Sequence, residues 1–300
     1  MRVLNDNNEQ RTEVPEVNFS EVFFWGLLSA IGFSSLLLAP LPVIVAHLRL
    51  TDPWSKVATL LGALVGLLYF ELPIWTVAFE FVFALIAADL ISREKSLWWV
   101  LGLPVALGVA VFCGSLTVMS AQKGVPVLAF WNQLVADWAI QLKAALPSQT
   151  TVQWDVISTL LAEQGVFLLM GILFLSLWLS IGLLAHFNAF PAGHRLGGQE
   201  LRKQIAPKWL SLGFVAFFLL GILNWPFGPL FLGVFRVFST VMFIFGTCAV
   251  SRVLSRRHVL GPIRSAVYLV SVMLGFYVVV GLGFVSPWTR SFLSEETKVL

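Results

Sequence analysis

Three ionisable residues, Glu80, Glu163 and Arg236, lie inside long apolar runs of the sequence. Ionisable groups within membrane-spanning segments are energetically costly and often mark functional sites. In each run, the ionisable residue lies about seven residues from one end, the end farther from the basic loops. At the rise of an α-helix, each residue then lies roughly 10 Å below the same surface. The shared depth predicts that the three side chains can meet inside a helical bundle.

This predicted polar patch, which Gln164 would extend, has two interpretations. A pocket open to the side away from the basic loops would use Arg236 to pair with a carboxylate or to bind an anionic group of a ligand. A structural ion pair would instead hold three helices together, although desolvation makes buried pairs poor stabilisers. The candidate ligand-binding residues are Glu80, Glu163, Gln164 and Arg236.

A second candidate surface is a stripe of small residues, Gly26, Ala30 and Ser34, at four-residue intervals in the first apolar run. Small residues at this spacing let another helix approach closely. The stripe therefore predicts either a docking face for a partner subunit in the membrane or a packing face within the chain itself.

No complete catalytic, metal-binding or cofactor-binding motif is present, so we expect neither enzyme activity nor a metal or cofactor. Cys113 and Cys248 have no neighbours at metal-ligand spacing, and we interpret them as small buried hydrophobic residues. The glycine-rich segment 193–198 lacks the Lys-Ser or Lys-Thr pair of a phosphate-binding loop. The basic residues fall in short loops, which indicates topology signals and not a nucleic-acid surface.

The composition indicates a membrane protein: 58% of the 300 residues are hydrophobic and 12% are charged, about half the charged fraction of ordinary soluble domains. Long continuous apolar runs favour helices over a transmembrane barrel. The runs cover residues 22–48, 57–70, 74–91, 97–119, 156–185, 209–225, 230–250 and 266–285. We therefore predict an all-α, polytopic transmembrane helical bundle of about eight spans over residues 21–287, with polar tails at 1–20, expected to be mobile, and at 288–300.

Two segments have special features. Pro40 and Pro42 should interrupt the first run, because proline lacks a backbone donor and clashes with the preceding turn. That run is either one kinked span or a helix followed by a segment that doubles back.

Residues 126–146 form an amphipathic pattern, whose apolar positions are Leu128, Trp131, Val135, Trp138, Leu142 and Ala145. The pattern predicts a helix on the membrane surface or a cap over the bundle.

The loops differ strongly in charge. One set holds Arg49, Lys56, Arg93, Lys95, Arg195, Arg202, Lys203, Lys208, Arg252, Arg256, Arg257 and Arg264, whereas the opposite set holds only Lys123 and Lys143. The bias predicts that the basic loops are cytoplasmic, in a bacterial inner membrane. The amino terminus then lies outside if the first run is one span and inside if it doubles back.

Short motifs rich in glycine, proline and arginine lie along residues 20–290. They are Gly26 to Phe33, Ala39 to Pro42 with Leu48 and Arg49, Ala206 to Trp209, Phe245 to Thr247, Gly281 to Phe284, and Trp288 with Arg290. Together they resemble the YybS-like family of predicted bacterial membrane proteins, which has no established activity. That family is similar, distantly, to the substrate-binding S components of energy-coupling-factor transporters. The resemblance implies that Gly26, Ala30 and Ser34 dock a transmembrane coupling subunit.

Two functions follow as hypotheses. The first is a transport-related substrate-binding subunit that holds a small, mostly apolar solute with a polar group near Glu80, Glu163 and Arg236. Because no nucleotide motif is present, ATP hydrolysis would come from partner proteins. The alternative is a membrane scaffold or assembly factor without a small-molecule ligand, which would act through the small-residue stripe and the basic loops.

Overall fold

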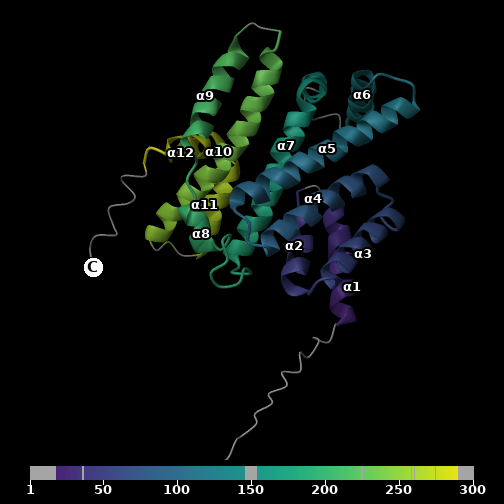
Figure 1. Cartoon of the computed structure of the whole chain (residues 1–300). Helices are drawn as coiled ribbons and strands as arrows, with labels where there is room; N and C mark the ends of the chain where they lie inside the picture. Colours follow the sequence, from purple (N-terminus) through teal and green to yellow (C-terminus); the bar gives the residue numbers. More distant parts are fainter. Residues whose placement is uncertain are drawn as a thin grey trace, which may run out of the picture.

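The structure, a computed structural model, describes residues 18–35, 37–145, 154–223, 226–257, 259, 261–273 and 275–289. Within these ranges all regular secondary structure is helical (Figure 1). The helices are α1 (Phe19–Phe33), α2 (Pro40–Arg49), α3 (Trp54–Leu68), α4 (Ile74–Ser92), α5 (Leu97–Gln122), α6 (Val127–Ala145), α7 (Trp154–His186), α8 (Gly198–Lys203), α9 (Lys208–Ile222), α10 (Gly228–Arg256), α11 (Gly261–Met273) and α12 (Phe276–Val285). The all-α prediction is confirmed, and most of each predicted polar tail, 1–17 and 290–300, lies outside the described residues.

Four helices in the described part of the chain, α4, α5, α7 and α10, are long and apolar enough to cross a membrane. They match four of the eight predicted spans and indicate an integral membrane protein. The other four predicted spans form shorter apolar helices, so eight full spans are not confirmed. The 15 residues of α1, of α3 and of α9 extend only about 22 Å, less than the ~30 Å of a bilayer core.

The first apolar run doubles back on itself. α1 ends at Phe33, and α2 begins at Pro40. Proline has no backbone N–H, but the N–H groups in the first turn of a helix have no acceptor within the helix, so proline there loses no hydrogen bond. Arg49, at the end of α2, lies 5.9 Å from the centre of the Trp25 ring in α1. The two helices therefore form an antiparallel hairpin, and α1 starts at the end of the molecule where Arg49 lies.

The small-residue stripe packs against a helix of the same chain. α3 runs parallel to α1, and a Cβ atom built on Gly62 of α3 would lie 2.7 Å from the Gly26 backbone oxygen and 3.1 Å from the Ala30 nitrogen. Gly26 and Ala30 are buried as a result, whereas Ser34 stays exposed at the end of α1. Of the two interpretations of the stripe, internal packing therefore accounts for Gly26 and Ala30.

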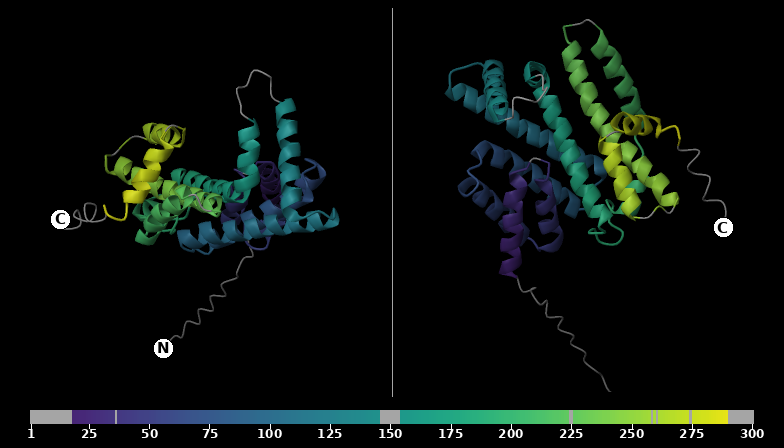
Figure 2. Two further views of the ribbon diagram at one scale, coloured as in Figure 1. Left: turned by 90° about the horizontal axis from the view of Figure 1, so that it is seen from above. Right: turned by 180° about the vertical axis from the view of Figure 1, so that it is seen from behind.

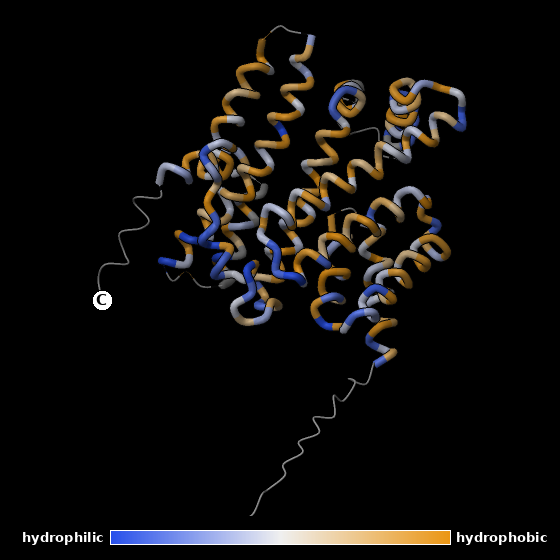
Figure 3. Tube along the Cα trace, in the orientation of Figure 1, coloured by the Kyte–Doolittle hydropathy of each residue, from blue (hydrophilic) through white to orange (hydrophobic). Residues whose placement is uncertain are grey.

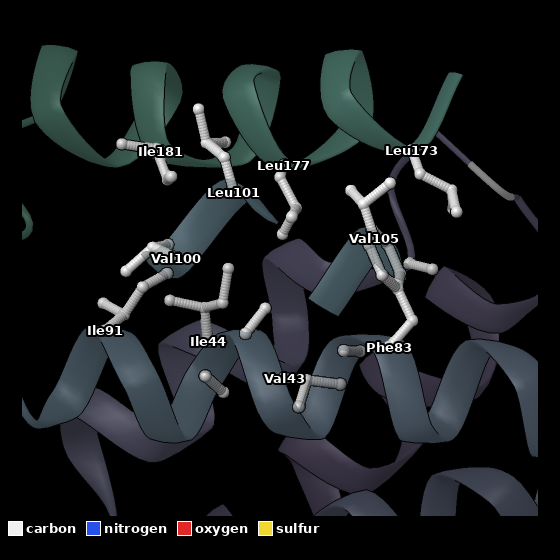
Figure 4. Packing of buried hydrophobic residues seen from close by; sticks show 14 of the residues in the cluster. Val43, Ile44, Phe83, Ile91, Val100, Leu101, Val105, Leu173, Leu177 and Ile181 are labelled. Atoms are coloured by element: carbon white, nitrogen blue, oxygen red, sulfur yellow. The ribbon is translucent and has the colours of Figure 1, made fainter. Parts of the chain in front are cut away.

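The largest apolar core lies where α2, α4, α5 and α7 meet. Figure 4 shows a ridge of α7, formed by Leu173, Leu177 and Ile181, facing α5, with α4 and α2 beyond it. All three ridge side chains are fully buried. On the other side of α7 stands α10, which packs in turn against α9 and α12 (Figures 1 and 2). α7 is thus the central helix, and it separates α4 from α10.

α6 confirms the predicted helix at 126–146 and pairs with the first turns of α7 in an arm that projects from the other helices (Figure 2). The Trp131 indole Nε1–H lies 3.2 Å from each of the backbone oxygens of Leu161 and Ala162 in α7, and donates to both. A Cβ atom on Gly165 would overlap the Trp131 ring. Leu128 and Trp138 of the predicted apolar face are exposed, so only part of that face packs against α5 and α7.

The basic loops gather at one end of the molecule, where hydrophilic segments cluster at the base of α2, α8 and α10 (Figure 3). His194 ties the 187–197 loop to this end of α4. Its Nδ1 accepts from the Leu196 N–H at 3.1 Å, and its Nε2 lies 3.0 Å from the Ile91 backbone oxygen. A neutral imidazole protonated at Nε2 satisfies both contacts. The cytoplasmic position of this end remains a prediction.

α10 and α12 touch through their backbones. A Cβ atom on Gly283 would overlap the Met242 carbonyl, and one on Gly246 would overlap the Val279 carbonyl. Gly281, two residues before Gly283, has open space at the same position. We therefore predict that Gly283→Ala destabilises the protein by about 3 kcal/mol through overpacking, whereas Gly281→Ala has little effect. Thermal unfolding of the two detergent-purified variants measures this difference, and equal midpoints would contradict it.

A second prediction concerns the arm. Trp131→Phe keeps an aromatic ring between α6 and α7 but removes both indole hydrogen bonds, at a cost of about 1 kcal/mol. We expect the amide hydrogens of α6 to exchange about fivefold faster in this variant. Trp138→Phe, which changes an exposed ring of the same helix, is the matched control. If the amide hydrogens of α6 exchange at the same rate in both variants, the Trp131 hydrogen bonds do not hold α6 against α7.

Candidate functional site

Glu80 is buried in the middle of α4. Its side chain is 3% exposed, and the Oε2 atom has no hydrogen-bond partner. The neighbouring Phe79 and Phe83 pack on α5 at Gly108, where a Cβ atom would lie 3.2 Å from the Phe79 ring and 3.6 Å from Leu173 of α7. Glu80 is therefore level with the start of the α7 ridge, on a helix that packs against α5 and α2.

Glu163 lies on the arm and is exposed. It is ten residues before Leu173 on α7, a distance of about 15 Å along the helix. The equal depth expected for Glu80 and Glu163 is therefore not found. Sequence counting assumed straight, parallel helices, whereas the first turns of α7 project from the bundle together with α6 (Figure 2).

Arg236 and Gln164 both lie on the contact between α7 and α10. A Cβ atom on Gly233 would overlap the Phe167 ring, and one on Gly171 would lie 3.2 Å from Thr240 Oγ1. Residues three and seven positions apart share one face of a helix. Arg236, three residues after Gly233, thus lies between these two contact points on α10.

By the same spacing, Gln164 lies on the face of α7 that carries Phe167 and Gly171, one turn before Phe167. Gln164 is 5% exposed, and its Oε1 atom is buried without a hydrogen-bond partner. Arg236 is half-buried, and one of its terminal guanidinium nitrogens is also buried without a partner. A donor group and an acceptor group are thus available along the same helix contact.

The ion pairs found in the described part of the chain are Lys56–Asp52, Arg93–Asp89 and Lys203–Glu200, all between neighbours on the surface. None of them includes Glu80, Glu163 or Arg236. Among the described residues, the interpretation of Arg236 as one half of a helix-pinning ion pair is therefore not supported. Its other interpretation, an arginine that binds an anionic group, stays a prediction.

Two neighbours of Arg236 were not identified from sequence. Thr240, one turn later, donates its hydroxyl to the Arg236 backbone oxygen at 3.1 Å and faces Gly171. Because Gly171 has no side chain, α7 can approach α10 at the level of Thr240. The four-residue spacing between Arg236 and Thr240 is visible in the sequence, but which face α10 turns to α7 depends on the tertiary packing.

Other kinds of chemistry find little support in the described ranges. No group of three or more His, Cys, Asp and Glu side chains there could hold a metal ion. Cys248 is buried and Cys113 half-buried, and both are free thiols on different helices.

No family model, curated protein or solved structure matches the chain. The resemblance to the YybS-like family therefore remains a prediction, and the function has to be argued from the site itself.

The unpartnered oxygen of Glu80 generates a stability prediction. A buried polar group without a hydrogen bond costs about 1–3 kcal/mol. Glu80→Met removes this group while keeping a side chain of similar length, so we expect the purified protein to gain about 1 kcal/mol, measured as a higher midpoint of thermal unfolding. Glu163→Met, at an exposed position, is the control and should leave the midpoint unchanged. A lower midpoint for Glu80→Met would mean that Glu80 stabilises the helix packing.

Proposed function

We propose that this integral membrane protein is a transport-related binding subunit that holds a small anionic solute at the contact between α7 and α10. The observation that carries the proposal is Arg236, an arginine at the contact between two apolar helices that forms no ion pair among the described residues. Intramembrane arginines are expensive, and they commonly mark a pathway or binding site. A carboxylate or phosphate on a solute would supply the missing counter-charge.

Gln164 supports the same site. Its unpartnered Oε1 can accept a hydrogen bond, so a solute that carries a hydroxyl or amino group in addition to its acid would offer a partner to each side chain. The nearby groups Phe167, Gly171 and Gly233 are apolar, which suits a solute with an apolar body. Glu80 lies across the α7 ridge and Glu163 lies exposed on the arm, so neither is part of this site.

The scaffold alternative has less support. It would act through the basic loops and through the stripe of Gly26, Ala30 and Ser34, but Gly26 and Ala30 of that stripe pack against α3. A coupling subunit at this stripe would have to displace α3 from α1. The partner of a binding subunit, if it has one, is therefore expected at another face.

The proposal is tested by ligand-induced stabilisation of the purified protein. A ligand at one hundred times its Kd stabilises the folded state by about 2.7 kcal/mol. We predict that at least one member of a panel of small carboxylates, phosphates and sulfonates raises the thermal midpoint of the wild-type protein. Arg236→Gln should abolish the shift, and Arg236→Lys, which keeps the charge, should retain part of it.

Glu163→Gln is the matched control, because it changes a polar residue of α7 that lies outside the proposed site. It should leave the ligand-induced shift intact. If every active solute stabilises Arg236→Gln as much as the wild type, the site is elsewhere. If no solute shifts the wild type, the binding-subunit proposal fails.

A further inference from the structure

The end of the molecule that carries α8 has an excess of positive charge. Residues 195–208 and 252–257 contain seven lysines and arginines and one acidic residue, Glu200. Glu200 is already paired with Lys203. We define the basic patch as Arg202, Lys203, Lys208, Arg252 and Arg257, which α8, the start of α9 and the end of α10 bring to this end.

The two central arginines of the basic patch, Arg202 and Arg252, donate hydrogen bonds to backbone oxygens and to a hydroxyl, and not to carboxylates. The Arg252 guanidinium donates to the backbone oxygens of Arg202 at 2.7 Å and Gln204 at 3.0 Å. The Arg202 guanidinium donates to Ser255 Oγ at 2.7 Å, while its Nε is buried without a partner. The contacts fix both side chains in position but leave their positive charge without a neutralising carboxylate among the described residues.

Tryptophans indicate where the basic patch lies relative to the bilayer. Trp209 is exposed and directly follows Lys208, and its ring lies 5.7 Å from that of Trp98. Trp99, beside it, is exposed as well. Tryptophan is enriched at membrane–water interfaces, where its ring lies at the level of the lipid headgroups. The basic patch, at the same ends of α5 and α9, is thus positioned to meet headgroups.

We propose that the basic patch binds the phosphate of an anionic phospholipid headgroup in the leaflet at this end of the molecule. A guanidinium presents its N–H groups in a planar fork that matches two phosphate oxygens. The exposed Lys208 and Arg257 lie at the same end as the fixed arginines and add attraction to a negatively charged leaflet. The lipid supplies the counter-charge that the described part of the chain lacks. This site is separate from the proposed solute site on α7 and α10.

The test uses the full-length protein, delipidated in a neutral detergent. Phosphatidylglycerol, phosphatidylcholine or inorganic phosphate is added, and bound lipid is counted by native mass spectrometry across a concentration series. We expect phosphatidylglycerol to bind and phosphatidylcholine to bind at least tenfold more weakly. Each charge removed, by Arg202→Gln or Arg257→Gln, should weaken phosphatidylglycerol binding about fivefold. Arg257 is exposed, so its variant tests the charge without disturbing the network around Arg252.

Arg93→Gln is the matched control. It removes a positive charge at the same end, but one that already pairs with Asp89 at 3.0 Å, and it should leave lipid binding unchanged. Equal binding of phosphatidylcholine would overturn the proposal, as would equal losses in the Arg93 and Arg257 variants. Binding of inorganic phosphate that displaces phosphatidylglycerol at similar concentration would show a site for a free anion and overturn the lipid assignment.

Discussion

Close approach between helix backbones is the constraint on which this fold depends. Within a bilayer, lipid chains are as apolar as leucine, so helices associate through van der Waals contact and hydrogen bonds, and not through the hydrophobic effect. Glycines meet the backbone of a neighbouring helix at two junctions, Gly62 between α1 and α3, and Gly246 with Gly283 between α10 and α12. At a third junction, between α7 and α10, Gly233 makes room for the Phe167 ring. These junctions join the amino-terminal hairpin to α3 and the carboxyl-terminal helices to the central α7.

The same constraint explains where polar groups lie. Many serine and threonine hydroxyls in the helices bond to backbone oxygens three or four residues earlier, as Thr59 and Ser180 do. Ser176 instead reaches the Leu37 backbone oxygen at 3.0 Å, at the turn between α1 and α2. Buried side-chain atoms without a partner occur in the four long apolar helices at Glu80, Gln164 and Arg236, and in shorter helices at His47, Arg202 and Arg264. They are the places where the sequence departs from what packing alone requires.

The sequence predicted some of this structure and not the rest. Apolar runs predicted the helices, and Pro40 predicted the break after α1, because both signals act locally. The number of spans was not predictable from hydropathy, since α1 and α3 are as apolar as the long helices but end after 15 residues. The two interpretations of Gly26 and Ala30 could not be separated, because a partner helix and α3 require the same small side chains. The position of Glu163 depended on how α6 pairs with α7, a long-range contact through Trp131.

The lengths of the helices have a consequence for the lipid around the protein. α7 has 33 residues and α10 has 29, whereas α1 and α3 have 15 each. Helices long enough to cross a bilayer core thus stand in the same molecule as apolar helices that are too short to cross it. Were α1 and α3 to lie across a bilayer, the lipid chains beside them would have to shorten or tilt, at a cost of a fraction of a kcal/mol for each ångström of mismatch. In that arrangement the folded protein would be sensitive to bilayer thickness, and a thin membrane would stabilise it more than a thick one.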